Sequence, residues 1–455
     1  MICKCSMNNV TIQPPGGFGG ASVLYTFDNT SNDYYGNYNA NPFNNPGFVS
    51  PGYNGRGSAV QFFSNRSQCF SIANHMDFHN KSLTMEAWVY PSISTIAGSD
   101  VIIYVQMNAQ LYGQAVYTTL RSGRFLGSFY FIDTYTLTVF QPNQWQHLAF
   151  TYNFSTRTLA VYFNGDLGRE NINIENSIFR LTLFFLLDNT NTSADPCQVT
   201  NGTQHIGCLS GTSRFFDGYM DQLTFLFNRS KTADEILGDA TLVAYYTMDC
   251  TNIDSGPNHM NSTAVDLSQG DGGRVKESFL FNLHSSYFQV TQLLLLGEWY
   301  RPFSFAMWLR PVTLVTLGGT ILHLSRDIDG TNSCAQLIGL NSFGQIVVHG
   351  LNTSGLVELV GPVLKTAEWI HIVETYSQTN GLRLYVNGTL YGQSSPFSYA
   401  ASGVPMTVTL GQALSGGENC LHGTIRTGYY RGQIDEFYIY SRELSQAHVT
   451  TLSNP

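Results

Sequence analysis

The chain has few charged residues. Only 12% of its 455 residues are Asp, Glu, Lys or Arg, roughly half of the share in an average soluble domain. Just 22 Lys and Arg stand against 31 Asp and Glu, the formal net charge is −9, and no basic run occurs. Nucleic acid and anionic membrane surfaces both need a cationic partner, so the composition excludes them as ligands.

Long apolar segments are also missing. The longest runs, 181–187 and 293–296, are strand-sized and far below the ~20 residues that span a bilayer, so we expect no membrane insertion. The N-terminus MICKCSMNNV lacks the apolar core of a secretory signal.

Eight Cys and frequent N-x-Ser/Thr sequons nevertheless favour an extracellular or cell-surface location. With no signal visible, we expect the chain to be a fragment or an incomplete gene model. The sequons that we select as glycosylation candidates are Asn65, Asn153, Asn201, Asn261 and Asn352.

Aromatic residues and glycines are abundant. The chain holds 30 Phe, 26 Tyr and 43 Gly, and 43% of its residues are hydrophobic. This composition buries ample apolar surface, which excludes disorder. It is typical of β-rich proteins with many tight turns.

The sequence repeats itself once. Five landmarks recur in the same order about 214–224 residues later. The matched pairs are 23–28 with 243–249, 83–91 with 303–311, 144–148 with 368–372, 161–165 with 384–388, and 218–225 with 432–439. We therefore predict an N-terminal extension over 1–20 and two domains over 21–239 and 240–455.

Each repeat predicts an all-β sandwich. Asn-Gly lies between apolar alternations at Asn164-Gly165 and Asn387-Gly388, which is a strong hairpin signal. One short helical turn is expected near the end of each repeat, with Thr232 or Ser445 as its N-cap. About 200 residues per repeat favour two tandem antiparallel sandwiches with jelly-roll closure.

These motifs resemble the laminin G-like jelly-roll family of the concanavalin A-like lectin/glucanase superfamily. The resemblance rests on YTFD, AWVYP, WQHLAF, VYFNG and GYMDQL in the first repeat, and on MWLRP, EWIHIVETY, LRLYVNG and GQIDEFYIYSRELS in the second. The second repeat also has Asp254-Ser-Gly-Pro-Asn258 after its first strand. In the first repeat, residues 29–56 look like a longer insertion instead.

The resemblance specifies fold more than function. It implies a non-enzymatic extracellular binding or adhesion module whose rim loops recognise a glycan or an extracellular protein. One alternative is an architectural spacer without a specific ligand, and a less favoured one is a glycan-processing enzyme. Glycoside hydrolysis needs two carboxyl groups about 5–9 Å apart. No Glu-x-Asp-x-x-Glu signature occurs, and Glu86 has Ala306 as its counterpart.

The conserved-looking aromatic and histidine positions have structural interpretations. His147 and His371 occupy the same Trp-x-His position without ligand-spaced partners, so we expect buried structural residues. The duplicated tryptophans could stack on sugars, but their strand patterns favour packing in the core. They are Trp88, Trp145, Trp308 and Trp369.

The 29–56 segment supplies the candidate ligand-binding residues of the first repeat. Exposed Tyr among Asn and Gly is typical of adaptable binding loops, although a long insertion can also pack its own aromatics. The candidates are Tyr34, Tyr35, Tyr38 and Tyr53.

Four cysteines are predicted to form disulfides, Cys197 with Cys208 and Cys334 with Cys420, because each pair closes a loop within one repeat. A cytosolic chain would instead keep buried thiols. Cys3, Cys5, Cys69 and Cys250 are not assigned.

Calcium is the candidate cofactor, because the superfamily often binds it. Asp28 and Asp249 end the first strands, and Asp221 and Asp435 lie in the last strands. First and last strands of a jelly roll tend to be neighbours, so each pair could supply two hard oxygen ligands. Alternatively, each Asp accepts hydrogen bonds from backbone N–H groups.

Overall fold

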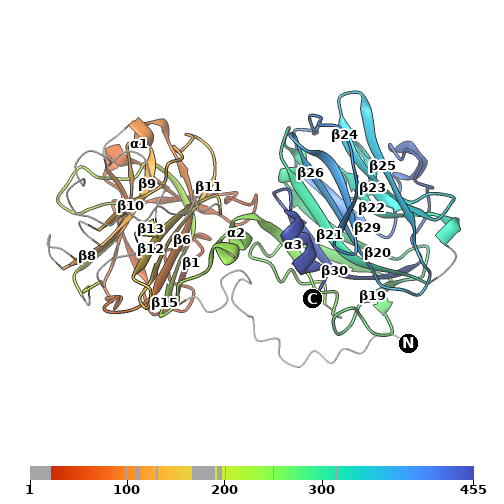
Figure 1. Cartoon of the computed structure of the whole chain (residues 1–455). Helices are drawn as coiled ribbons and strands as arrows, with labels where there is room; N and C mark the ends of the chain where they lie inside the picture. Colours follow the sequence, from red (N-terminus) through yellow and green to blue (C-terminus); the bar gives the residue numbers. More distant parts are fainter. Residues whose placement is uncertain are drawn as a thin grey trace. The chain divides into compact units, whose positions relative to one another are not determined.

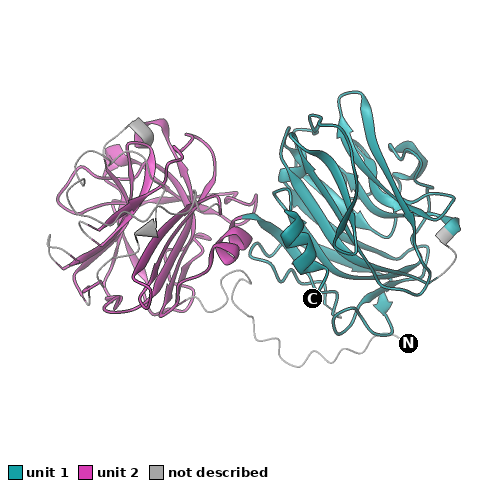
Figure 2. Ribbon diagram, in the orientation of Figure 1, with its two compact units in different colours: residues 1–17, 241–455 teal, residues 18–240 magenta. Residues whose placement is uncertain are grey.

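The structure is a computed structural model of the chain and describes residues 22–97, 100–108, 113–129, 132–165, 190–191, 197–199, 201–249, 251–312 and 315–455. The chain divides into two compact units between Ala240 and Thr241, within one residue of the boundary predicted from the repeats (Figure 2). Each unit is a sandwich of two antiparallel sheets (Figure 1). The predicted all-β class and tandem jelly rolls are confirmed. The predicted extension over 1–20 lies outside the described residues.

In the first sandwich, one sheet contains the Trp88 strand, and we call it and its counterpart the tryptophan sheet. Its strand order is β3 (Gly47–Val49), β4 (Ala59–Phe62), β15 (Gly218–Phe227), β6 (Leu83–Pro91), β11 (Gln146–Asn153), β12 (Thr158–Phe163) and β13 (Thr190–Asn191), with β1 (Val23–Tyr25) also on β15. The opposite sheet runs β2 (Ala40–Phe43), β5 (Cys69–Ile72), β14 (Thr203–Ile206), β7 (Val101–Met107), β8 (Ala115–Arg121), β9 (Arg124–Ser128) and β10 (Asp133–Tyr135).

The second sandwich repeats this order. Its tryptophan sheet runs β18 (Ser268–Gln269), β19 (Phe279–Phe281), β30 (Gly432–Tyr440), β21 (Phe303–Pro311), β26 (Ile370–Ser377), β27 (Gly381–Val386) and β28 (Thr389–Gln393), with β16 (Leu242–Tyr246) on β30. The opposite sheet runs β17 (Ser262–Val265), β20 (Tyr287–Leu293), β29 (Met406–Leu410), β22 (Gly319–Ser325), β23 (Ala335–Leu340), β24 (Gln345–Asn352) and β25 (Gly355–Val363). Every described strand thus has its equivalent in the other sandwich.

Side chains alternate across the tryptophan sheets, as pleated strands require. Leu83, Met85, Ala87 and Val89 of β6 point into the first core. The intervening side chains, Trp88 among them, therefore occupy the outer face, which is turned away from the core. The same alternation in β21 places Phe303, Phe305, Met307 and Leu309 in the second core.

The four tryptophans belong to neither inner core cluster, which corrects the core-packing interpretation for Trp88, Trp145 and Trp369, whereas Trp308 is buried as expected but on the outer face. Trp88 pairs with His147 on β11, and Trp308 pairs with His371 on β26, so the two positions are equivalent. Trp308 is only 6% exposed, whereas Trp88, Trp145 and Trp369 are half-buried. The prediction failed because other segments cover this outer face, so both faces of the strands read as apolar.

A helix covers part of each outer face. α2 (Ala233–Thr241) packs Ile236 against Ala149, Ala160 and Tyr162. α3 (Gln446–Leu452) packs Val449 into the equivalent cluster of the second sandwich. The hydroxyl oxygens of Thr232 and Ser445 accept N–H bonds at the helix starts, which confirms both predicted N-caps.

The remaining helical segments are one or two turns long: α1 (Ile93–Ala97), η2 (Ser64–Arg66), η3 (Leu295–Gly297), η4 (Val315–Leu317) and η5 (Gly417–Asn419). None of the helices in the described ranges has the length and apolar character that crossing a bilayer demands.

Candidate functional site

Asp28 and Asp221 hold the two ends of one loop in the first sandwich. Oδ2 of Asp221 accepts the N–H of Tyr53 at 3.0 Å, and Oδ1 of Asp28 accepts the N–H of Ser58 at 2.8 Å. A Cβ on Gly52 would lie 2.4 Å from Oδ2 of Asp221. The close approach of loop and carboxylate therefore requires glycine at this position.

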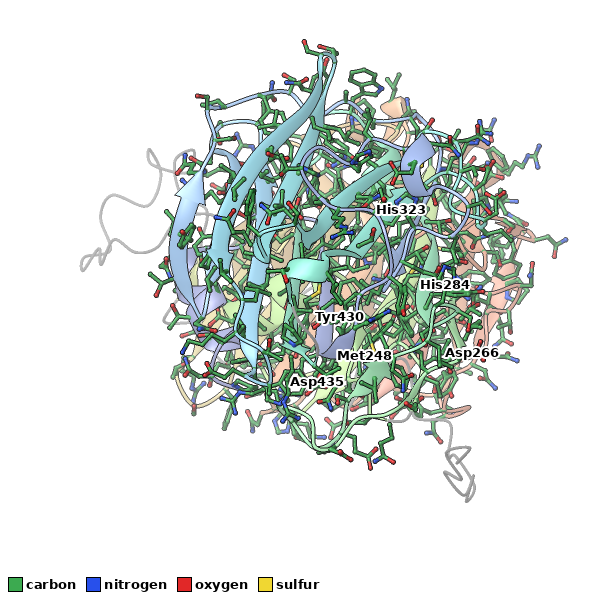
Figure 3. The ribbon with its side chains drawn as sticks, turned by 90° about the vertical axis from the view of Figure 1, so that its right-hand side faces the viewer. Met248, Asp266, His284, His323, Tyr430 and Asp435 are labelled. Carbon is green, nitrogen blue, oxygen red and sulfur yellow. A yellow bond between two sulfur atoms is a disulfide. The ribbon has the colours of Figure 1, made fainter. Side chains whose placement is uncertain are left out.

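The second sandwich builds the same arrangement. Oδ2 of Asp435 accepts the N–H groups of Arg274 and Val275 at 2.6 and 3.0 Å. Oδ1 of Asp249 accepts the N–H of Glu277 at 3.1 Å. Gly273 takes the place of Gly52, since its Cβ would lie 2.7 Å from Oδ2 of Asp435. Asp435 lies on β30, well apart from His323 on β22 (Figure 3).

In each sandwich, a β-bulge turns the aspartate of the last strand toward the loop that it binds. The register shifts directly after Asp221 and after Asp435, and the next residues, Gln222 and Glu436, have φ of 51°. Burial, followed by the charges of Glu436 and Asp249, raises the pKa of Asp435 to about 7. In each predicted pair of metal ligands, the two aspartates hold the same loop and influence each other electrostatically, and each accepts at least one backbone N–H group.

No group of three His, Cys, Asp or Glu side chains suited to a metal ion occurs in the described part of the chain. Oδ2 of Asp435 already accepts two N–H groups, and its Oδ1 accepts that of Glu436 at 3.1 Å. The carboxylate oxygens are nevertheless the hard donors that Ca²⁺ prefers, and an oxygen that accepts a single N–H, such as Oδ1 of Asp249, keeps a second lone pair. A calcium ion would be held by carboxylate oxygens of this kind.

Each anchored loop places one side chain over the tryptophan of its sheet. Tyr53 stacks on Trp88 with ring centroids 4.3 Å apart. The equivalent residue, Arg274, places its guanidinium 4.7 Å from the centroid of the Trp308 ring. The same position of the fold thus carries an aromatic ring in one sandwich and a cation in the other.

In the first sandwich this stack belongs to a larger aromatic cluster on the outer face. Tyr90 contacts Trp145 and Tyr219 at centroid distances of 5.6 and 5.4 Å, and Tyr53 contacts Trp145 at 6.3 Å. The rings of this cluster pack against one another on the outer face.

The two histidines of the Trp-x-His motif are buried beside these tryptophans. His147 and His371 are each 1% exposed. Their backbone N–H groups donate to the Oδ1 atoms of Asn164 and Asn387, both at 2.9 Å. The duplicated His and Asn-Gly motifs therefore join the two strands of the β11–β12 hairpin and of the β26–β27 hairpin. Burial, together with the charge of Arg274, lowers the pKa of His371 to about 4 and keeps it neutral.

The four candidate tyrosines of residues 29–56 do not form one site. Tyr34 is 45% exposed and meets Tyr35 edge-on at 5.4 Å. Tyr38 instead packs against the core and contacts Phe227 at 6.0 Å. Tyr53 belongs to the outer-face stack described above.

The segment 29–56 is also not an insertion, which corrects the expectation. It contains β2 and β3, the counterparts of β17 and β18. Asp33 replaces Asp254 in its role: Asp33 accepts the N–H groups of Leu24 and Tyr38, and Asp254 accepts that of Tyr245. The two segments differ in sequence because only the anchoring carboxylate is required.

The cysteine pairing is partly as predicted. Cys334 and Cys420 are bonded with S–S 1.96 Å. The predicted Cys197–Cys208 bond is wrong, because Cys208 is bonded to Cys69 and Cys197 is a buried thiol. β5 and β14 are neighbours in the sheet, which brings the Cα atoms of Cys69 and Cys208 to 5.7 Å despite a sequence separation of 139. Cys3, Cys5 and Cys250 lie outside the described residues.

The glycosylation candidates differ in exposure. Asn65, Asn201 and Asn261 are exposed. Asn153 and Asn352 are half-buried, and their Oδ1 atoms accept backbone N–H groups two residues further on.

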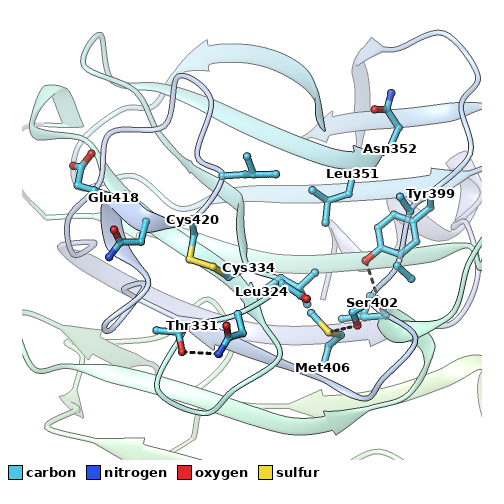
Figure 4. Close-up of a pocket in the computed structure, with 17 residues that line it drawn as sticks. Leu324, Thr331, Cys334, Leu351, Asn352, Tyr399, Ser402, Met406, Glu418 and Cys420 are labelled. Atoms are coloured by element: carbon cyan, nitrogen blue, oxygen red, sulfur yellow. Dashed lines mark hydrogen bonds between the residues drawn. A yellow bond between two sulfur atoms is a disulfide. The ribbon is translucent and has the colours of Figure 1, made fainter. Parts of the chain in front are cut away.

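A pocket of about 790 Å³ opens at one end of the second sandwich, and we call it the rim pocket (Figure 4). Its walls come from the ends of β22, β24 and β29 and from the loops between them. Its floor is apolar, with Leu324, Leu351 and Met406, and the Cys334–Cys420 bond forms one wall. Its polar lining residues are Thr331, Asn332, Ser333, Asn352, Ser402, Glu418 and Asn419.

Several of these polar groups are held in place. Nδ2 of Asn332 donates to Oδ2 of Asp327 at 2.6 Å, and Oγ1 of Thr331 donates to Oδ1 of Asp329 at 2.7 Å. The hydroxyl of Tyr399 donates to the carbonyl of Leu296 at 3.0 Å, which joins two walls (Figure 4). The pocket is thus pre-organised for hydrogen bonding.

An exposed aromatic pair follows the pocket-lining Leu296. Trp299 is 46% exposed and Tyr300 53%, and their rings lie 6.0 Å apart. The N–H of Tyr300 donates to the carbonyl of Tyr399 in the pocket wall at 3.3 Å. The sequence interpretation missed Trp299, although it is the single tryptophan without a counterpart in the other repeat.

Comparison with known proteins gives one family. A family model described as the concanavalin A-like lectin/glucanases superfamily matches residues 64–187 and 283–450. No curated protein matches the chain. These results confirm the predicted resemblance.

Solved structures match one half of the chain at a time. They include the binding domain of paraclostridial mosquitocidal protein 1 (18% identity, 48% of this chain and 52% of that one, TM-score 0.36) and the botulinum neurotoxin serotype G binding domain (15%, 47% and 50%, 0.35). Domain 4 of the Geobacillus stearothermophilus arabinanase AbnA, solved with arabinotriose, also matches (17%, 47% and 98%, 0.32). The alignments thus span about half the length of the two toxin domains.

Proposed function

We propose that this chain, which belongs to the concanavalin A-like lectin/glucanases superfamily, is a non-enzymatic extracellular binding module that recognises a glycan through its rim pocket. The fold is that of a lectin-type jelly roll, so the family supports a binding role for carbohydrate or protein. The choice of glycan rests on the rim pocket itself.

The observation that carries the proposal is an exposed aromatic pair joined to a polar pocket. A sugar ring has an apolar C–H face and a rim of hydroxyl groups. Trp299 and Tyr300 offer ring faces to the first, and the amides and hydroxyls of Asn332, Ser333 and Asn419 can bond the second. The volume of about 790 Å³ is within the usual range for small-ligand sites.

The pocket lining favours a neutral ligand and no hydrolysis. It contains no Lys, Arg or His, and Glu418 is its single carboxylate. Hydrolysis of a glycosidic bond requires a second carboxyl group across the bond. Binding without cleavage is the chemistry that this set of side chains supports.

Two features support an exterior location. Disulfides persist in oxidising compartments, and each sandwich has one. Three candidate sequons have exposed Asn side chains that glycosylation could reach.

Calcium belongs to the same proposal. An ion between Asp249 and Asp435 would offset the repulsion of two neighbouring carboxylates, and loop carbonyls and water would complete the six to eight ligands that Ca²⁺ takes. It would fix the loop that carries Arg274.

The test is a screen of the full chain, with calcium present, against an array of neutral and charged glycans. We expect neutral ligands to bind, and Trp299→Ala and Asn332→Ala each to lower affinity at least tenfold. Trp299 neighbours the pocket through Leu296 and Tyr300, and Tyr391→Ala is the matched control, because Tyr391 is 54% exposed and lies on β28 of the tryptophan sheet, away from the strands that line the pocket. Glycan binding that both pocket variants retain would place the site elsewhere. Binding of peptides but of no glycan would favour the protein-ligand alternative.

A further inference from the structure

A second pocket of the second sandwich lies on the outer face of the tryptophan sheet, and we call it the outer pocket. Its volume is about 680 Å³. Its lining includes Arg274, Trp308 and Trp369, together with Thr389, Gln446 and Thr450 from β28 and α3. It shares no lining residue with the rim pocket.

Both the backbone and the side chain of Arg274 are held in place. Its N–H donates to buried Asp435, and its guanidinium covers the face of Trp308. A guanidinium stacked on a ring keeps its N–H donors at its edge, where they can grip a planar or tetrahedral anion. Arg274 is exposed, and no ion pair to its guanidinium occurs within the ranges that the structure describes.

The first sandwich shows that the fold does not need a cation here. Tyr53 takes the place of Arg274 on the same anchored loop and stacks on Trp88. Two further outer-face positions change in the same direction, since Tyr90 and Tyr219 of the first sandwich correspond to Arg310 and Gln433. The second copy has thus exchanged an aromatic surface for a polar and cationic one.

The opposite side of the pocket carries hydroxyl and amide groups. Thr389, Gln446 and Thr450 are exposed. Oγ1 of Thr450 and Nε2 of Gln446 already bond each other at 3.1 Å, so these groups form an ordered polar wall. Donors and acceptors that line one pocket together with indole rings suit a sugar better than a peptide, because each sugar ring carries several hydroxyls close to a flat C–H face.

We propose that the outer pocket binds an anionic sugar residue, with its carboxylate or sulfate group on Arg274 and its ring against Trp369. This site is separate from the rim pocket. It takes a negatively charged ligand, whereas the rim pocket favours a neutral one. Because the outer pocket has no acidic lining residue, the ligand charge meets Arg274 without a competing carboxylate in the wall.

The experiment is titration calorimetry of the full chain with sialyllactose, a sulfated heparin disaccharide and neutral lactose, all at constant calcium. We expect at least one anionic probe to bind more tightly than lactose and to weaken as salt rises. Arg274→Tyr should lower the anionic affinity at least tenfold. This variant introduces the residue that the first sandwich uses at the same place, so it should fold. Arg274→Lys should retain an intermediate affinity, because the charge stays and the two-pronged geometry is lost.

Two controls separate this site from others. Arg66→Tyr removes another arginine stacked on a ring, 4.6 Å from the centroid of Phe63 and outside either pocket, and should change nothing. Trp299→Ala should abolish neutral binding at the rim pocket and leave the anionic affinity intact. Equal anionic affinity of the wild type and Arg274→Tyr, or tighter binding of a hexaglutamate peptide than of both charged sugars, would overturn the proposal.

Discussion

A buried charge cluster in the first sandwich has an apolar counterpart in the second, and this pair allows a quantitative prediction. Nζ of Lys231 lies 2.5 Å from Glu86 and 2.7 Å from Asp239, beneath α2. The equivalent positions of the second sandwich are Ala306, Leu444 and Leu452. One fold thus accommodates either an ionic or an apolar set at the same place.

The charges of this cluster depend strongly on one another. Burial opposes ionisation of Glu86, but Lys231 and His147 outweigh it and lower the pKa of Glu86. Burial and the charge of Glu86 raise the pKa of Asp239 to about 8. Removing Lys231 alone would leave two buried acids without a cation, which typically costs about 3–5 kcal/mol.

Replacing the whole cluster has a different expected result. An apolar set of similar volume in place of a buried ionic cluster is often neutral or stabilising by about 1–4 kcal/mol. From the cost of about 3–5 kcal/mol for the loss of Lys231 alone, we expect Lys231→Leu to lower the melting temperature of the first sandwich by roughly 6–20 °C, at about 2–4 °C per kcal/mol. The triple variant Glu86→Ala, Lys231→Leu, Asp239→Leu should melt at or above the wild-type temperature.

The assay is calorimetry of the full chain, with hydrogen exchange of peptides from β6 and β21 to assign each transition. The second sandwich is the internal reference and should not shift. A triple variant as unstable as Lys231→Leu would show that the ionic cluster itself stabilises the fold and would refute the reasoning.

Three further predictions concern single groups. Both carboxylate oxygens of Glu374 are buried without a hydrogen bond in the described structure, and burial raises the pKa of this group. Stability of the second sandwich should therefore fall as pH rises above about 4.5. Glu374→Leu should flatten this pH dependence in urea titrations and add about 1–3 kcal/mol at pH 7. EDTA should lower the melting temperature of the second sandwich, and Asp435→Ala should abolish that sensitivity; identical melting curves with and without chelator would leave only the backbone-anchor role. Cys69→Ser and Cys208→Ser should destabilise the first sandwich equally, by about 4–5 kcal/mol, whereas the Cys197 thiol, whose pKa burial raises to about 12, should resist alkylation until unfolding, as peptide mapping would show.

The sequence predicted the fold well because the duplication doubles every local signal. Two Trp-x-His motifs and two Asn-Gly turns fix the order of the strands before any contact is known. It predicted the inner and outer faces of β6 poorly. Thr84 and Glu86 alternate with the core residues, but Trp88 and Tyr90 on the same outer face are aromatic, since other side chains such as Tyr53 cover that face. A strand covered on both sides loses its alternation.

The sites depended on contacts that sequence spacing does not encode. Cys69 and Cys208 are distant in the chain and adjacent only through the strand order β5–β14. The bulges after Asp221 and Asp435 turn these side chains toward a loop, and a regular strand pattern gives no sign of them. The rim pocket likewise assembles walls from residues 296 to 421, so only the folded chain shows it.

The equivalent outer faces explain how one duplicated scaffold can carry two ligand chemistries. Trp88 and Trp308 recur, and each packs beside a buried histidine whose backbone N–H joins the two strands of a hairpin. The residue above the tryptophan differs between the sandwiches, and backbone N–H groups hold its loop to the aspartate in both. Tyr53 closes the first surface with its own ring, whereas Arg274 leaves charged donors at the edge of a pocket. A single position, whose backbone N–H anchors the loop in both sandwiches, therefore changes the chemistry of the face while the loop stays in place.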